Sequence, residues 1–240
     1  MKKTYKKKKR GFIVTVVLTF LLYLCIFAVI FAVKEGFVGT LAAGEHLSYE
    51  DIDYKNEQEW SLILVNPWNP VPDGYEVELT DLKGGHKVDS RIYPLLQEMF
   101  DDARKEGIKP YIYSSYRTHE YQQYLYDKEI EDYKAKGYNA EEAEAIAKTW
   151  VAYPGTSEHQ IGLAIDITSE NKEKQAPEEV WEWLEKNSYK YGFILRYTEE
   201  KTDITGISPE PWHYRYVGKK AAKEIYKNGV CLEEYLENKK

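Results

Sequence analysis

The stretch Ser157-Glu-His-Gln-Ile-Gly-Leu-Ala-Ile-Asp166 combines a histidine and an aspartate with an aliphatic run. An ionised aspartate among aliphatic side chains is costly to bury unless an opposite charge compensates it, and a metal ion often does so. Gly162 lies between the two residues and lets the backbone bend, so that His159 can return over Asp166. The stretch therefore predicts two metal ligands, His159 and Asp166.

The motif Glu210-Pro-Trp-His213 can supply the groups that such a site still lacks. A catalytic zinc site generally has three protein ligands and one position for water. Zinc lowers the pKa of that water to about 7, and a nearby carboxylate that does not bind the metal can take its proton. We therefore expect His159, Asp166 and His213 to bind Zn²⁺ and Glu210 to act as the catalytic base.

Together these motifs resemble the LAS metallopeptidases, the group that includes lysostaphin, the D-Ala-D-Ala carboxypeptidases and the sonic hedgehog fold. Within this group the chain is most similar to the VanY-type D-alanyl-D-alanine carboxypeptidases, over residues 60 to 226. The supporting stretches are Tyr113-Ser-Ser-Tyr-Arg-Thr118, Tyr191-Gly-Phe-Ile-Leu-Arg-Tyr197, and Thr205-Gly206 ahead of Glu-Pro-Trp-His-Tyr-Arg-Tyr-Val-Gly218. The resemblance implies a zinc carboxypeptidase that trims the terminal D-Ala from peptidoglycan stem peptides.

The resemblance also implies roles for residues outside the two metal motifs. Arg117 matches the arginine that handles negative charge at the substrate, and a planar guanidinium can hold a terminal carboxylate with two hydrogen bonds. Gln122, Ser157 and Tyr197 match positions that line the substrate pocket. Each has a purely structural alternative: a solvent-facing helix position for Gln122, a turn cap for Ser157 and a core position for Tyr197.

Several other functions share these residues. An L,D-carboxypeptidase that acts on tetrapeptide stems, or an endopeptidase or dipeptidase of the same fold, would use the same metal and base. A non-catalytic zinc module that binds the cell wall is a further alternative. Glu210 argues against that module, because a purely structural zinc site needs no base. The mass of the product distinguishes the enzymes from one another.

The elements that must position these residues follow from hydrophobic periodicity and from capping and turn residues. The pattern predicts helices over residues 91–106, 118–136, 139–150, 177–187, 219–228 and 232–237, and strands over 62–65, 109–113, 164–168, 193–197 and 212–217. Short strands interspersed with helices indicate an α+β domain. We expect a small, mostly antiparallel sheet flanked by helices, and the resemblance implies the hedgehog/D-Ala-D-Ala peptidase fold.

The N-terminal part of the chain has the pattern of a membrane anchor. Seven basic residues precede residue 11, and residues 11–33 carry no charge, which is long enough for a helix that spans a bilayer. The expected organisation is a cytoplasmic tail (1–10), a transmembrane helix (11–33), a stalk (34–58) and an extracellular catalytic domain (59–240). The alternative is a cleaved signal peptide, cut near residues 41–44.

The charge of the chain is unevenly distributed and limits its partners. All 40 acidic residues follow Lys34, so the part after the predicted anchor is strongly acidic. Nucleic-acid binding depends on neutralising phosphates with basic residues, and it is not expected here. The expected partners are a peptidoglycan stem peptide and, through the N-terminal helix, the lipid bilayer.

Overall fold

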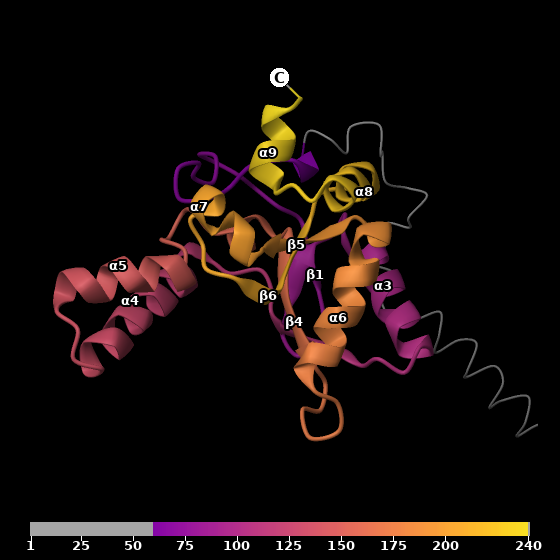
Figure 1. Ribbon diagram of the computed structural model, residues 1–240, viewed down its shortest axis with the longest axis horizontal. Helices are drawn as coiled ribbons and strands as arrows, with labels where there is room; N and C mark the ends of the chain where they lie inside the picture. The colour runs from indigo at the N-terminus through magenta and orange to yellow at the C-terminus, as the bar shows by residue number, and fades with distance from the viewer. Residues whose placement is uncertain (1–59, 240) are drawn as a thin grey trace, which may run out of the picture. The chain divides into compact units, whose positions relative to one another are not determined.

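The computed structural model describes residues 60–239, which form helices and short strands around a central sheet (Figure 1). The α-helices are α3 (Tyr93–Lys105), α4 (His119–Ala135), α5 (Ala140–Trp150), α6 (Pro177–Asn187), α7 (Thr202–Thr205), α8 (Lys219–Asn228) and α9 (Leu232–Glu237). The strands are β1 (Leu79–Asp81), β2 (Lys87–Asp89), β3 (Pro110–Ser114), β4 (Ala164–Ser169), β5 (Phe193–Tyr197) and β6 (Glu210–Tyr216). The 3-10 turns are η1 (Glu158–Ile161), η2 (Ser188–Tyr191) and η3 (Glu199–Lys201).

Four strands form the central sheet in the order β3-β4-β6-β5, and each neighbouring pair is antiparallel. Strands β1 and β2 form a separate antiparallel hairpin. In the register of the central sheet, Asp166 of β4 lies opposite His213 of β6. These two predicted ligands are therefore neighbours although they are far apart in the sequence. The arrangement confirms the predicted α+β class with a small antiparallel sheet.

Helices α3 and α6 pack with the sheet to form the main hydrophobic core. Successive side chains of a strand point to opposite faces of the sheet. Ile165 and Ile167 of β4 are completely buried in this core, so Asp166 between them points to the other face. The same alternation places Tyr214 of β6 in the core and leaves His213 on the face of Asp166. One face of the sheet thus stabilises the fold, and the other carries the predicted ligands.

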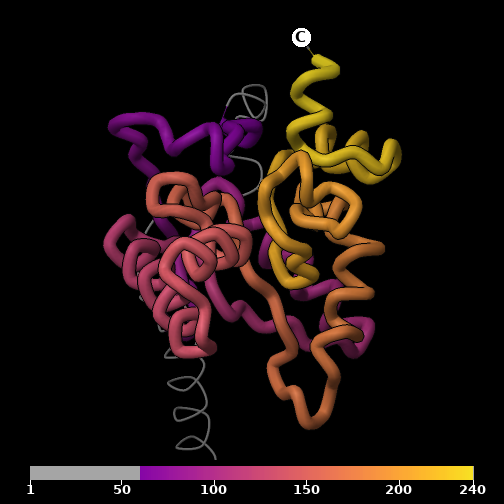
Figure 2. The backbone as a smooth tube through the Cα atoms, turned by 60° about the vertical axis from the view of Figure 1, so that its left-hand side comes forward, coloured from indigo at the N-terminus to yellow at the C-terminus, as the bar shows by residue number. Residues whose placement is uncertain are grey.

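Helices α4 and α5 form a hairpin that stands out from the sheet in Figure 1 and comes to the front in Figure 2. Thr118 caps α4, because its hydroxyl accepts a hydrogen bond from the Tyr121 amide at 3.2 Å. Asn139 and Glu142 form a capping box at the start of α5. Gly137 connects the two helices with a φ of +98°, which glycine adopts without strain.

The strand predicted over residues 62–65 is wrong. These residues form no strand in the described part of the chain. The carbonyl oxygens of Ser61 and Ile63 instead accept hydrogen bonds from Arg215 Nη2, at 2.9 and 2.8 Å. A buried guanidinium therefore satisfies backbone groups that a strand would pair with another strand. The β1–β2 hairpin, conversely, was not predicted.

The helix predicted over residues 91–106 begins slightly later in the structure, as α3 (Tyr93–Lys105). The N-cap of α3 is Ile92 and makes no side-chain capping hydrogen bond, and a proline lies in the first turn of the helix. Asp89, just before this helix, accepts a hydrogen bond from the Arg91 amide at 2.9 Å and pairs with the Arg91 guanidinium. Its carboxylate therefore ends the β1–β2 hairpin rather than beginning the helix.

The predicted tail, transmembrane helix and stalk, residues 1–10, 11–33 and 34–58, lie outside the described residues. Among residues 60–239, no helix combines the length and apolarity needed to cross a membrane. The membrane anchor and the domain boundaries therefore stay predictions.

Candidate active site

The three predicted metal ligands lie together on the face of the sheet away from the core. His159 comes from η1, Asp166 from β4 and His213 from β6; all three are buried, and their ligand atoms lie within 4.8 Å of one another. Asp166 Oδ1 is 3.3 Å from His159 Nε2 and 3.2 Å from His213 Nδ1. Two ligands bonded to a tetrahedral zinc ion at about 2.0–2.1 Å are about 3.3 Å apart. The spacing therefore fits zinc.

Hydrogen bonds on the far side of each ring direct lone pairs toward the centre of this cluster. His159 Nδ1 lies 2.8 Å from the carbonyl oxygen of Ser115, so this nitrogen carries the proton and donates it. His213 Nε2 lies 3.4 Å from Glu158 Oε2 and donates in the same way. Asp166 Oδ1, which faces the other nitrogens of both rings, is a buried atom with no hydrogen-bond partner among residues 60–239. His159 Nε2, Asp166 Oδ1 and His213 Nδ1 therefore face one point with their lone pairs, and such an arrangement requires a cation.

The surrounding charges favour positive charge at the same point. Burial, followed by the positive charge of Arg117, lowers the pKa of His159 to about 4, so this ring is neutral and able to bind a metal. Burial alone would lower the pKa of His213, but the carboxylates of Asp166, Glu158 and Glu210 around the ring outweigh it and raise that pKa well above its usual range. A divalent cation supplies the positive charge that these carboxylates stabilise.

The bend predicted at Gly162 is confirmed. Gly162 ends η1 in the left-handed conformation, with a φ of +74°. A β-carbon at this position would lie 3.0 Å from the backbone nitrogen of Asp89, which donates a hydrogen bond to the Gly162 carbonyl. Both the conformation and the lack of space exclude a side chain. The bend brings His159 back over Asp166.

Glu210 lies beside the cluster without being one of its three ligands. Its Oε2 atom is 3.3 Å from His213 Nδ1, and its side chain is 10% exposed. Residues three apart on a regular strand point to opposite faces, but β6 bulges here, because Leu195 pairs with Tyr214 whereas Tyr197 pairs with Glu210. Burial raises the pKa of Glu210, which favours uptake of a proton. This is the geometry expected of a base.

Arg117 connects the metal cluster with the wall of a cavity. Its Nη2 donates to Asp166 Oδ2 at 2.9 Å, its Nε to Ser114 Oγ at 2.9 Å and its Nη1 to Gln122 Oε1 at 3.2 Å. The hydrogen bond from Nη2 occupies Oδ2 of Asp166 and leaves Oδ1 for the metal. A guanidinium has five N–H donors, so one on each η nitrogen remains for another ligand.

The other predicted substrate residues fall into two groups. Ser157 and Tyr197 line the cavity; Ser157 makes no capping hydrogen bond through its side chain, and the Tyr197 ring lies 4.7 Å from the His213 ring between centroids. Gln122 is completely buried and does not line the cavity. It lies behind Arg117, and its Nε2 donates to the Ala152 carbonyl at 2.7 Å. Gln122 is thus neither a cavity-wall residue nor the solvent-facing one that was the alternative.

The cavity at the metal cluster has a volume of about 340 Å³. It is lined by Tyr113, Arg117, Leu125, Lys128, Glu129, Trp150, Val151, Ala152, Ser157, His159, Asp166, Tyr197, Ile207, Glu210, Trp212 and His213. A larger cavity of about 390 Å³ lies between β5, η2 and α8, but it contains none of the predicted site residues. Volume alone therefore does not identify the site, whereas the convergence of titratable groups does.

Four charged residues behind the cluster were not predicted from the sequence: the buried Glu158, Arg196 and Arg215 and the half-buried Glu233, here called the charge network. Glu158 Oε1 accepts hydrogen bonds from Arg196 Nε and Arg215 Nη1, both at 2.8 Å, and Arg196 also pairs with Glu233 at 2.7 Å. Burial alone would raise the pKa of Glu158, but the two arginines outweigh it and lower that pKa. Ionised Glu158 thus fixes the orientation of His213. Its place between two motif residues, Ser157 and His159, was the available signal.

Comparisons with known proteins agree with this chemistry. Residues 85–219 match the VanY family, described as D-alanyl-D-alanine carboxypeptidase. The D-alanyl-D-alanine carboxypeptidase of Enterococcus faecalis is 56% identical over 185 residues, which cover 77% of this chain and 69% of that protein.

Two solved structures are similar to this chain along almost their entire length. One is a mutant of the vancomycin resistance D,D-pentapeptidase VanY in complex with Zn(II); it has a TM-score of 0.72 and 56% identity, and the match covers 74% of this chain and 99% of that one. The other is VanYB in complex with D-alanine-D-alanine, with a TM-score of 0.74 and 55% identity, covering 76% of this chain and 100% of that one. Together with the His-Asp-His cluster, the zinc complex confirms the predicted cofactor.

Proposed function

The chain belongs to the VanY family of D-alanyl-D-alanine carboxypeptidases, which makes it a zinc metallopeptidase, and from this premise we propose that it removes the terminal D-alanine from peptidoglycan stem peptides that end in D-Ala-D-Ala. One observation carries the proposal. Asp166 Oδ1 is buried and has no hydrogen-bond partner in the described part of the chain, and it lies between two histidine nitrogens and beside a carboxylate that can act as a base. The relative solved with D-Ala-D-Ala supports the choice of substrate.

His159, Asp166 and His213 would hold the zinc ion, which when bound supplies Lewis-acid chemistry by polarising the scissile carbonyl and acidifying a water molecule. Glu210 takes the proton of the attacking water and later donates it to the leaving amine. Its raised pKa suits both steps, because a carboxyl group whose pKa lies closer to neutral pH can both take up and release a proton. Glu158 holds the His213 ring in place while the charge at the cluster changes.

Arg117 is the group that recognises the end of the substrate. Its remaining N–H donors, one on each η nitrogen, can bind the terminal carboxylate in a bidentate manner. Gln122 and Ser114 hold the guanidinium in place from behind. A terminal carboxylate bound here lies close to the metal cluster, because Arg117 is already hydrogen-bonded to Asp166. This selects for cleavage at the end of a chain rather than within it.

We also propose that the enzyme is anchored in the cell membrane with its catalytic domain outside. The uncharged run over residues 11–33 and the seven basic residues before it support this orientation. After cell lysis, the full-length chain should sediment with membranes and require detergent for release. Protease added to intact cells with the wall removed should degrade the catalytic domain. Recovery of the whole domain in the culture medium would instead indicate a cleaved signal peptide.

The activity is tested with the full-length, zinc-loaded chain and a stem pentapeptide that ends in D-Ala-D-Ala. We expect release of free D-alanine and a product that has lost one residue, as measured by mass spectrometry. Glu210→Gln with normal zinc content is the matched control and should release almost none. Loss of two residues at once would identify a dipeptidase, and cleavage of a tetrapeptide stem in preference to the pentapeptide would identify an L,D-carboxypeptidase.

A further inference from the structure

A second cavity adjoins the metal cavity, and the proposed reaction does not use it. It has a volume of about 300 Å³ and is here called the aromatic groove; its lining residues are Tyr113, Thr168, Lys172, Pro177, Trp181 and Trp212. Tyr113 and Trp212 line the metal cavity as well, so the two cavities share a wall. The groove therefore continues the path that a substrate follows away from the metal cluster.

The groove presents aromatic surfaces that are held in place by the fold. The Trp181 and Trp212 rings lie 6.1 Å apart between centroids, and Trp181 Nε1 donates to the Ile167 carbonyl at 2.8 Å. Tyr113 is 70% exposed although it is a large aromatic residue. Fixed and accessible aromatic rings can cover the apolar parts of a ligand with little loss of side-chain entropy.

The position of Arg117 determines which end of a substrate reaches the groove. Arg117 is attached to the α4–α5 hairpin, because its Nη1 donates to Gln122 of α4 and Gln122 in turn donates to the Ala152 carbonyl after α5. A terminal carboxylate bound to Arg117 therefore lies toward the hairpin, where Leu125 and Trp150 line the metal cavity. The shared wall of Tyr113 and Trp212 is no part of the hairpin, so it offers the residues on the amino-terminal side of the scissile bond a path that the hairpin does not occupy.

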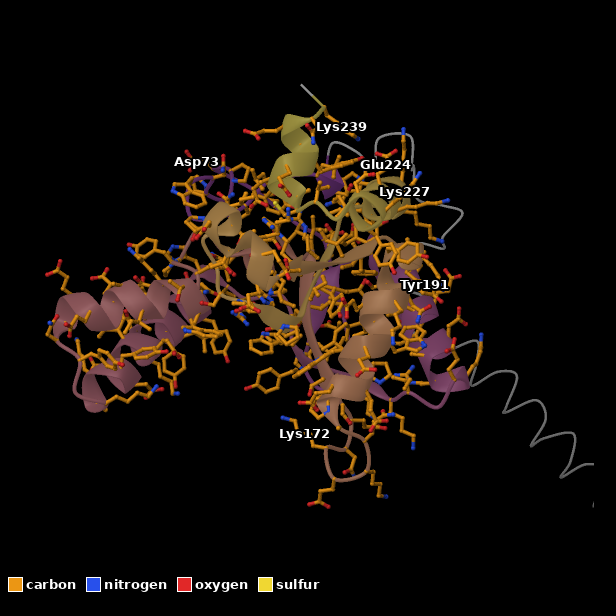
Figure 3. All side chains as sticks on the ribbon, viewed as in Figure 1. Asp73, Lys172, Tyr191, Glu224, Lys227 and Lys239 are labelled. Carbon is orange, nitrogen blue, oxygen red and sulfur yellow. The ribbon has the colours of Figure 1, made fainter. Side chains whose placement is uncertain are left out.

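Lys172 adds a positive charge to the groove. It lies on the loop between β4 and α6 (Figure 3), it is exposed, and it forms no ion pair with any residue of the described part of the chain. The other lining residues are uncharged, so Lys172 sets the sign of the charge in the groove. A ligand that combines apolar surface with a carboxylate complements this lining.

We propose that the aromatic groove binds the peptide segment on the amino-terminal side of the scissile bond, and that Lys172 attracts a carboxylate of that segment. The inference rests on the proposed carboxypeptidase activity. Peptide is the occupant rather than sugar, because the atoms that adjoin the scissile bond, and hence the shared wall, belong to the peptide. The groove thus makes the enzyme prefer a complete stem peptide to a short D-Ala-D-Ala peptide.

The test compares two substrates of the full-length, zinc-loaded chain: acetyl-D-Ala-D-Ala, and the pentapeptide L-Ala-γ-D-Glu-L-Lys-D-Ala-D-Ala. Trp181→Leu should lower kcat/KM for the pentapeptide about tenfold and change that for the short peptide less than about twofold. Lys172→Ala should lower kcat/KM about threefold, and only for a pentapeptide whose D-glutamyl carboxylate is free rather than amidated. Trp68→Leu, 64% exposed and outside both cavities, and Lys174→Ala, on the same loop as Lys172, are the matched controls.

The possible outcomes separate this inference from the proposed function. A wild-type chain that cleaves neither peptide contradicts the proposed function itself. Equal losses on both substrates, or no loss on the pentapeptide, would overturn the groove proposal alone. A loss seen only with a substrate that carries sugar would show that the groove binds glycan, which also overturns it. If the wild type cleaves only the pentapeptide, Trp181→Leu must still lower that activity with unchanged zinc content.

Discussion

Two buried clusters of charged side chains lie next to each other in this molecule, and they differ in whether their atoms have partners. In the charge network, Glu158 accepts from two arginines, and Arg215 donates to Glu158 and to the backbone oxygens of Ser61, Ile63 and Tyr216. In the metal cluster, Asp166 Oδ1 has no hydrogen-bond partner among residues 60–239. Buried charges with all their partners hold the fold together, whereas the unpartnered one marks where a ligand belongs.

His213 belongs to both clusters. Its Nδ1 faces Asp166 and Glu210, and its Nε2 faces Glu158 of the charge network. The network reaches from there to α9, because Arg196 pairs with Glu233. The orientation of one metal ligand therefore depends on packing at the C-terminal end of the domain. Substitutions in the two clusters should separate activity from stability, and the following predictions test that separation.

Removal of the Asp166 carboxylate, whose Oδ2 pairs with Arg117 and whose Oδ1 faces the two histidines, should have the largest effect on activity and a small effect on folding. We expect Asp166→Ala to lose zinc and to lower D-alanine release by more than about 100-fold, since even changes behind the ligands of a metal site cost 10- to 100-fold. The zinc-free variant should be as stable as zinc-free wild type within about 1–2 kcal/mol, because removal of the costly buried Oδ1 atom offsets loss of the ion pair with Arg117. Metal analysis and urea unfolding measure the two effects. A strongly destabilised zinc-free variant would contradict the comparison.

Substitution of the neighbouring base should affect only turnover. Glu210→Gln keeps the size of the side chain and removes its ability to take a proton. We expect kcat to fall about 10²- to 10⁴-fold, the usual contribution of a general base, while zinc content stays at the wild-type level. Steady-state release of D-alanine and metal analysis of the same preparation provide the measurement. Loss of zinc from this variant would show that Glu210 is a ligand instead.

A substitution in the charge network should act mainly on stability. Glu158→Gln leaves Arg196 and Arg215 without their shared carboxylate in a fully buried site. We expect a loss of about 3–5 kcal/mol in the free energy of unfolding, with or without zinc. Glu234→Gln is the matched control, because its ion pair with Lys201 is partly exposed and should contribute no more than about 1 kcal/mol. Equal effects of the two substitutions in urea unfolding would refute the distinction.

The outer end of the network should give the smallest effect, and one that depends on pH. Burial alone would raise the pKa of Glu233, but Arg196 outweighs it and lowers that pKa. The stabilisation is therefore complete above the unfolded glutamate pKa of about 4.3 and is lost as the pH falls below it. We expect Glu233→Gln to cost about 1–2 kcal/mol at pH 7 and much less near pH 3. Urea unfolding at both pH values tests this, and a constant difference would contradict it.

Local sequence signals predicted most of the structure. The helices over 177–187, 219–228 and 232–237 and the strand over 193–197 have the predicted bounds, because capping residues, glycines and periodicity are all local. The clustering of His159, Asp166 and His213 was predicted from two motifs, since a buried aspartate beside a bend is hard to explain by packing alone. Their catalytic roles, and that of Glu210, stay predictions.

The charge network was not predicted because its contacts are long-range. Glu233 of α9 pairs with Arg196 of β5, which lies 37 residues earlier in the sequence, and Arg215 donates to the Ile63 carbonyl, 152 residues earlier. A strand-like apolar run at residues 62–65 indicates nothing about a guanidinium that will satisfy its carbonyl groups. Gln122 was misplaced for a similar reason, since a helical pattern does not reveal which polar residue is buried behind an arginine.

The α4–α5 hairpin separates the choice of substrate from the chemistry. It lines the metal cavity through Leu125, Lys128, Glu129 and Trp150, yet it contributes no metal ligand and no base. Its two helices pack against each other and meet at Gly137. Substitutions at these four lining positions would reshape this wall of the cavity and leave the metal ligands unchanged. Within this fold, the specificity of a peptidase can therefore evolve by exchange of one hairpin, on a catalytic sheet that stays constant.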